Sequence, residues 1–168
     1  FWIAIDTLFL TVVKHFNAAQ ITSLTTISLI ICIALQIPLL KIIKKIGNTN
    51  SVKISAFLLL LSSVLLTFGN SYLVIVLGKI LYEIAFTFQN MGNIILKNNL
   101  ELQNRSGDYI KIKTKSSTIY SIVTMIISFI ASVMFNINNY LPMYGCILFC
   151  VITFILSFNL LISTDCPI

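Results

Sequence analysis

Three ionisable residues lie within long apolar runs of this sequence: Asp6, Lys79 and Glu83. Burying an ionised group is costly unless it is paired, so such residues usually face each other or a water-filled cavity. Lys79 and Glu83 are four residues apart and would share one face of a helix. A carboxylate in apolar surroundings tends to take up a proton, because desolvation disfavours its charged form. These residue types therefore point to proton or cation binding.

Two interpretations of the three residues stay open at this stage. Glu83 lies about 18 Å beyond Ser71 along a helix that rises ~1.5 Å per residue, and Asp6 lies about 13 Å before His15 by the same rise. The two carboxylates are therefore expected at similar depth. In one interpretation Lys79 and Glu83 form a neutralised pair, with Asp6 near the outer interface. In the other, all three form a charge cluster in a cavity, where Asp6, which has no partner within one helical turn, is the better candidate for a proton or cation site.

The remaining polar residues suggest little further chemistry. Gln89 and Asn93 lie late in the same apolar run as Lys79, where they either line the inner mouth of a cavity or mark the membrane interface. A single histidine, His15, excludes a zinc motif with two histidines on one helix. Neither a Gly-x-Ser-x-Gly motif nor a phosphate-binding Gly-x-x-x-x-Gly-Lys motif occurs. We therefore expect no enzyme activity, no metal site and no cofactor.

The cysteines have a structural interpretation. Cys32, Cys146 and Cys150 lie in apolar runs, where cysteine behaves as a small hydrophobic residue. Cys146 and Cys150 would share a helix face, but no histidine or carboxylate lies near them in the sequence to complete a metal site. We expect these side chains to pack and not to bind a metal.

The composition shows that the apolar runs belong to a membrane protein. Of 168 residues, 58% are hydrophobic and 10% are charged, whereas soluble domains average about 45–50% and about 25%. A soluble fold cannot hide this much apolar surface, since polar side chains must cover its outside. We therefore expect an integral membrane protein that is surrounded by the lipid bilayer.

The apolar residues form six runs, at about 1–13, 21–43, 54–68, 72–96, 117–135 and 143–162. All six are longer than the about 9–11 residues of a membrane strand, and backbone groups in lipid must be satisfied within each run, so helices are expected. The first run is shorter than the about 20 residues of a span and begins at Phe1 within apolar sequence, so we expect a truncated first helix. The predicted fold is all-α, a polytopic bundle of about six transmembrane helices. It forms one domain over residues 1–163, and 164–168 begin a cytoplasmic linker or tail.

The basic residues are distributed unevenly among the connections. Most lie in the second and fourth connections, around 41–53 and 97–115, and Lys14 alone lies in the other three. Short basic loops stay in the cytoplasm, so we expect both segments to be cytoplasmic in a multi-pass protein of the cell membrane. The net charge of +6 then needs no nucleic acid to explain it, and no nucleic-acid partner is expected. The residues in these two segments are Lys41, Lys44, Lys45, Lys53, Lys97, Arg105, Lys111, Lys113 and Lys115.

This layout resembles the N-terminal half of a major facilitator superfamily transporter. That family carries Gly-x-x-x-Asp-Arg-x-Gly-Arg-Arg between its second and third helices. In the corresponding segment, Lys45 matches the basic position, Gly47 matches the second glycine, and Lys44 replaces the acid. Leu40 replaces the first glycine, and a polar pair replaces the two final arginines. In the fourth helix, Lys79 keeps only the first charge of the family's Arg-x-x-Gln-Gly, and the Gly-Pro motif of the fifth helix is absent from 117–135.

The resemblance covers about residues 1–163 and rests mainly on layout. It implies two three-helix units in inverted orientation, with the first and fourth helices lining a central cavity. The candidate residues of a substrate or ion cavity are Asp6, Lys79, Glu83, Gln89 and Asn93, and those of the cytoplasmic loop motif are Lys44, Lys45 and Gly47.

The resemblance implies a half of a secondary transporter that moves a small solute by alternating access, with proton or cation coupling. Its partners would be the lipid bilayer, the solute and a C-terminal half of the same chain. The alternative is a polytopic membrane module that does not transport, such as a sensor or a scaffold. A second half of similar layout would favour the transporter, and a fused soluble signalling domain would favour the alternative.

Overall fold

The computed structural model describes residues 2–158, and all regular structure within them is helical. The predicted all-α class is therefore confirmed for this part of the chain. The predicted domain end at residue 163 and the tail at 164–168 lie outside the described residues. The helices are α1 (Trp2–Val12), α2 (Ala18–Ile46), α3 (Asn48–Phe68), α4 (Tyr72–Gln89), α5 (Met91–Leu102), α6 (Asp108–Ile137) and α7 (Leu141–Phe158).

Five helices are long and apolar enough to cross a membrane, namely α2, α3 from Asn50 onward, α4, α6 and α7. Protein covers little of the surface of α2, α6 and α7, and large apolar side chains such as Ile33 and Phe129 are exposed on them. A continuous apolar surface of this kind calls for apolar surroundings. α1 has 11 residues and extends only about 16 Å, which is too short for a span, as the length of the first apolar run predicts.

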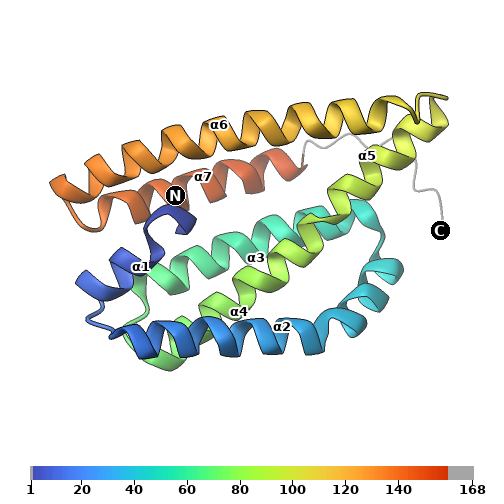
Figure 1. Cartoon of the computed structure of the whole chain (residues 1–168). Coiled ribbons are helices and arrows are strands. Elements are labelled where there is room, and N and C mark those ends of the chain that lie inside the picture. The colour runs from blue at the N-terminus through green and yellow to red at the C-terminus, as the bar shows by residue number, and fades with distance from the viewer. Residues whose placement is uncertain (1, 159–168) are drawn as a thin grey trace.

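The connections between helices gather at two ends of the bundle, because neighbouring helices alternate in direction (Figure 1). The uncharged turns at 69–71 and 138–140 lie at the same end as the connection at 13–17. At this end the Lys14 Nζ donates to the Thr67 carbonyl at 3.0 Å and to Asn70 Oδ1 at 3.3 Å. The bend at Gly47 and the turn at 103–107 lie at the opposite end. The two basic segments therefore share one end of the molecule.

These basic segments are mostly helical, which corrects the prediction of polar connections at 41–53 and 97–115. Only Gly47 separates α2 from α3, and its φ of 88° suits glycine. Only residues 103–107 separate α5 from α6. Hydropathy marks where a helix leaves the apolar region, but the helix continues into polar surroundings where lysine and similar residues favour it.

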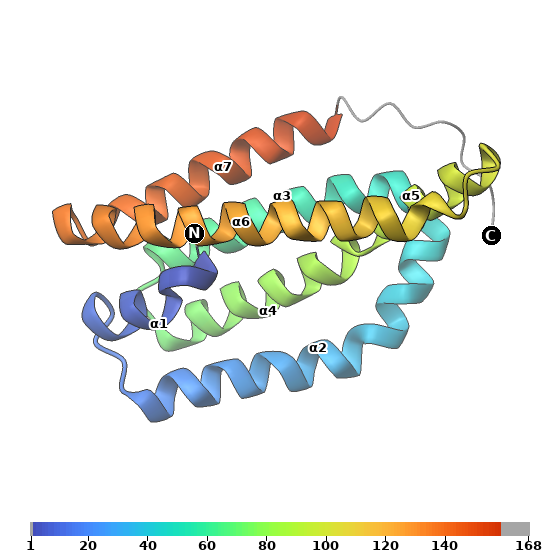
Figure 2. The same ribbon diagram turned by 45° about the horizontal axis from the view of Figure 1, so that its top comes forward.

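α3 occupies the centre of the bundle. It packs along α4 on one side and along α7 on the other, and α2 lies against α4 (Figure 2). α6 packs on α1 and α7 and lies beside α5 near its own beginning. The core between these helices is apolar, and its largest fully buried side chains include Phe9, Leu24, Leu66, Ile75 and Met143.

Small residues allow α3 and α4 to approach closely. Ser62 Oγ donates to the Gly78 carbonyl at 2.8 Å, and Ser55 Oγ donates to the Ala85 carbonyl at 2.9 Å. Small residues and interhelical hydrogen bonds drive association in lipid, where no hydrophobic effect acts between helices. This contact holds α4, with its charged residues, against the centre of the bundle.

Gly78→Val tests this packing. A Cβ at Gly78 would lie 3.0 Å from Leu66 Cγ and 3.3 Å from Leu65 Cβ, so a larger side chain forces the two helices apart. Overpacking of this kind costs about 1–3 kcal/mol, and we expect unfolding at a lower SDS concentration. Gly107→Val is the matched control, because a Cβ at Gly107 meets nothing within 4 Å. Equal effects of the two substitutions would contradict the packing argument.

Candidate functional site

Lys79 of α4 lies between the two carboxylates that the sequence singles out. Its Nζ is 3.7 Å from Asp6 Oδ2 on α1 and 4.0 Å from Glu83 Oε1, one turn further along α4. The structure therefore brings Asp6, Lys79 and Glu83 together, and we refer to them as the charge cluster. The Lys79–Glu83 contact follows from their spacing, whereas Asp6 joins only through the fold.

Asp6 reaches the charge cluster although the described parts of α1 and α4 do not pack backbone against backbone. α1 packs on α2, α6 and α7, and the long side chain of Lys79 spans the remaining distance. On α1 itself, the Thr7 N–H donates to Asp6 Oδ1 at 2.7 Å and the Thr7 hydroxyl donates to the same atom at 3.3 Å. The other oxygen, Oδ2, faces Lys79. The charged partner of Asp6 therefore lies on another helix and not within one turn of its own.

Tyr82 is a further member of the site that the sequence pattern did not indicate. The Lys79 Nζ lies 5.3 Å from the centroid of the Tyr82 ring, which is within the range of a cation–π interaction. The position of Tyr82, three residues after Lys79 on the same helix, is the signal that could have indicated it. The ammonium group thus has two carboxylates and one aromatic ring around it.

The charge cluster is buried at its centre and open at its edge. The Lys79 side chain is 10% exposed, whereas those of Asp6 and Glu83 are 31% and 23% exposed. When all three groups are ionised, the cluster has one negative charge in excess. An unmatched charge in apolar surroundings is costly, so one added proton or monovalent cation would neutralise the cluster. The two partly exposed carboxylates are the groups that can accept it.

The other predicted site residues lie towards the basic end and do not join the charge cluster. Gln89 is exposed as the last residue of α4. Asn93 of α5 accepts a hydrogen bond from the Lys113 ammonium of α6. Lys44 and Lys45 are exposed in the last turn of α2. Of the predicted cavity residues, Asp6, Lys79 and Glu83 therefore come together, whereas Gln89 is exposed and Asn93 contacts α6.

No known protein family, curated protein or solved structure matches this chain. Within residues 2–158, no group of three or more histidine, cysteine, aspartate or glutamate side chains is arranged to hold a metal ion. The function of the site therefore rests on its geometry.

Lys79→Met tests whether the charge cluster is a buried ion pair. The substitution leaves two neighbouring carboxylates without a cation. Removing one partner of a buried pair costs about 3–5 kcal/mol, and the partial exposure of Asp6 and Glu83 reduces this to about 1–3 kcal/mol. We expect lower expression and a lower unfolding temperature in detergent. Lys79→Met/Glu83→Gln should recover part of the loss, because it restores the original net charge of the cluster.

Lys97→Met is the matched control for this prediction. Lys97 forms a pair of the same i, i+4 spacing with Glu101 at 3.8 Å, but the two side chains are 60% and 51% exposed. Its loss should change the free energy of unfolding by less than about 0.5 kcal/mol. If both lysines prove equally dispensable, the charge cluster is not a buried ion pair.

Proposed function

We propose that this chain is the six-helix N-terminal half of a secondary transporter in the cell membrane, which moves a small solute by alternating access. The observation that carries this proposal is the contact of Lys79 with both Asp6 and Glu83. Ionisable residues within membrane-spanning helices are rare and usually mark a pathway for substrate, ions or protons. Here residues of two helices meet, and their carboxylates are open at one side.

Lipid and a second half of the same chain are the proposed partners. Helices satisfy their own backbone groups, so lipid tails can cover apolar side chains such as Leu73, Phe129 and Ile155, which are exposed on the long helices. A second six-helix half would close a cavity over the exposed edge of the charge cluster. The basic residues act as cytoplasmic anchors and require no nucleic acid.

Three of the contacts between helices fit two three-helix units of one design. We take α4 with its extension α5 as the fourth span, so the units are α1–α3 and α4–α7. α2 packs on α4, α6 packs on α1, and α3 packs on α7. Suppose that α1 is exchanged with α4, α2 with α6, and α3 with α7. The contact of α2 with α4 then becomes the contact of α6 with α1, and the contact of α3 with α7 stays the same. Inverted repeats place a transport site at their interface, and the charge cluster joins the first and fourth spans.

The charge balance supports coupling to a cation. Two carboxylates share one ammonium, so one bound proton or monovalent cation gives the cluster a neutral state. Asp6 is the more exposed carboxylate, and we assign it the binding role, while Glu83 keeps Lys79 paired. A bound cation neutralises the charge cluster. It thereby lowers the free energy needed to close the site off from water during the change from the outward-facing to the inward-facing state, because an unmatched charge is costly in apolar surroundings.

The proposed orientation places the basic end in the cytoplasm, and cysteine labelling tests it. In a background without native cysteines, Lys45→Cys and Arg105→Cys should be shielded from a membrane-impermeant maleimide in intact cells. Asn138→Cys should react, because short basic segments are retained on the cytoplasmic side and the uncharged turns are not. In permeabilised cells, the control, all three positions should label. Labelling of Arg105→Cys in intact cells would reverse the orientation.

The transport role of Asp6 is tested by uptake into vesicles that contain the full-length protein. A panel of small solutes is screened in the presence of a proton or cation gradient. We expect Asp6→Asn to abolish the gradient-driven uptake that the unsubstituted protein shows, because the cluster then has no excess negative charge to neutralise. Its expression and insertion should stay unchanged, since Glu83 still pairs with Lys79.

Asp108→Asn is the matched control for the uptake experiment. Asp108 is also an ion-paired carboxylate, with Arg105 at 3.0 Å, but it lies at the basic end of the bundle. Its neutralisation should leave uptake unchanged. Unchanged uptake with unchanged cation dependence in Asp6→Asn would remove Asp6 from the mechanism and leave a purely structural charge cluster.

A further inference from the structure

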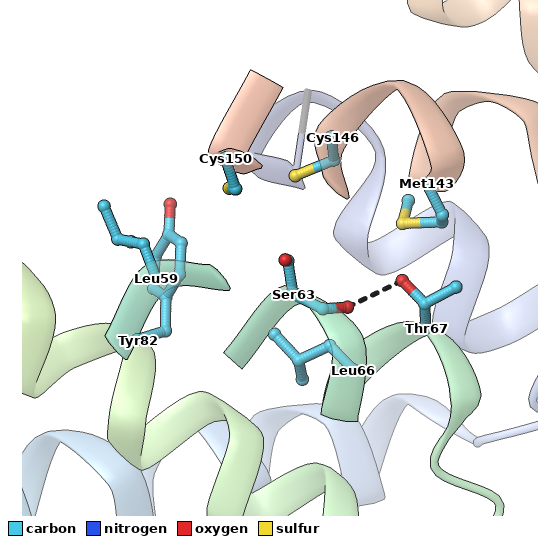
Figure 3. Close-up of a pocket in the computed structure, with 8 residues that line it drawn as sticks. All are labelled: Leu59, Ser63, Leu66, Thr67, Tyr82, Met143, Cys146 and Cys150. Atoms are coloured by element: carbon cyan, nitrogen blue, oxygen red, sulfur yellow. Dashed lines mark hydrogen bonds between the residues drawn. The ribbon is translucent and has the colours of Figure 1, made fainter. Parts of the chain in front are cut away.

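A small cavity lies between α3, α4 and α7 (Figure 3). Its volume of ≈ 20 Å³ is enough for about one water molecule. Ser63 and Thr67 of α3 and Tyr82 of α4 line it together with two leucines, and its surface is mostly apolar. No carboxylate and no imidazole lines it. The remaining lining comes from three sulfur-containing side chains of α7.

These three side chains lie on one face of α7. Met143, Cys146 and Cys150 are spaced three and four residues apart, which places them along one side of a helix. Figure 3 shows them on the side of α7 that faces Ser63, with Cys146 between the other two. Cys146 and Cys150 are both free thiols, and both line the cavity. Met143 is fully buried.

We propose that this cavity binds a soft monovalent cation of the Cu(I) class, with the sulfurs of Cys146 and Cys150 as main ligands and that of Met143 as a third. Thiolate and thioether sulfur are the ligands that favour Cu(I), whereas Mg²⁺ and Ca²⁺ prefer carboxylate and carbonyl oxygen. A metal-site pattern of histidine, cysteine and carboxylate residues misses this site, because its third ligand is the thioether of Met143. This site is independent of the proposed transport function.

The charge of the bound ion fits this ligand set. When a monovalent cation M⁺ binds, one cysteine S–H bond breaks and its proton leaves to water. The electron pair that stays on sulfur then forms the S–M bond. The second thiol and the thioether bind as neutral donors. The product is neutral, so it adds no charge to an apolar region. A divalent ion would give a neutral product only if both cysteines lost their protons.

The Ser63 and Thr67 hydroxyls donate hydrogen bonds to backbone carbonyls of their own helix, α3. Ser63 Oγ donates to the Leu60 carbonyl at 2.8 Å, and Thr67 Oγ1 donates to the Ser63 carbonyl at 2.7 Å. These hydrogen bonds fix the hydroxyl side chains at the wall of the cavity. The sulfurs of α7 therefore present the ligands that a soft cation prefers.

The experiment uses Ag(I) as the probe, in a background where Cys32→Ser and Cys166→Ser leave Cys146 and Cys150 as the only thiols. The full chain, purified in detergent, is titrated with Ag(I) against a competing chelator. We expect one tightly bound Ag(I) per chain. Loss of even an outer-shell partner costs about 10–100-fold in metal affinity. We therefore expect a loss of about a hundredfold or more in Cys146→Ser and Cys150→Ser, and of about tenfold in Met143→Leu.

Cys32→Ser alone is the matched control, because Cys32 lies on α2 and does not line the cavity. Silver affinity should be the same with and without this substitution. Equal silver retention in the background protein and in its Cys146→Ser/Cys150→Ser derivative would overturn the proposal, as would displacement of Ag(I) by an equal concentration of Zn(II).

Thiol protection keeps the test decisive if a cysteine variant does not fold by circular dichroism. In the folded background protein, bound Ag(I) should block maleimide labelling of both Cys146 and Cys150. Full labelling in the presence of Ag(I) would exclude these thiols as ligands.

Discussion

The pairing of Lys79 is the interaction on which the arrangement of this bundle depends. A buried ammonium on α4 is tolerable only where negative charge reaches it, and Glu83 and Asp6 supply that charge from α4 and α1. α1 has only 11 residues, and this ion pair and the apolar cluster that Phe9 shares with Ile75 link it to α4 without backbone packing. The position of α1 therefore depends on electrostatics as well as on the apolar core around Phe9. A site that holds two carboxylates against one ammonium keeps one negative charge in excess, and this excess is the basis of the proposed coupling to a cation.

α3 borders both the helix that carries Lys79 and the sulfur-lined cavity. One side of it meets α4 through hydrogen bonds from Ser55 and Ser62, which fix the helix that carries Lys79. Another side carries Ser63 and faces the sulfur-lined cavity beneath α7. Tyr82 belongs to both places, since its ring lies near the Lys79 ammonium and its side chain lines the cavity. Serine residues of the central helix α3 thus hold α4 by hydrogen bonds and line the sulfur-lined cavity.

Several features of the fold and the site could be predicted from the sequence. Long apolar runs predict helices, because only helices and closed barrels satisfy the backbone in lipid. The spacing of Lys79 and Glu83 predicts their contact. Helix ends were predicted less well, since residues 41–46 and 97–102 are polar in part and still helical. Hydropathy reports the boundary of the apolar region, whereas a helix ends where its backbone hydrogen bonding ends.

The sequence by itself determined the helical class, the grouping of basic residues at alternate connections and the pairing within α4, because these depend on local periodicity and composition. Only the tertiary structure decided that Asp6 shares Lys79 with Glu83, that Tyr82 joins them, and that the sulfur face of α7 borders a cavity. Contacts between helices depend on the depth and rotation of each helix in the bundle. Side-chain packing between residues far apart in the chain sets these quantities, and no local pattern contains them.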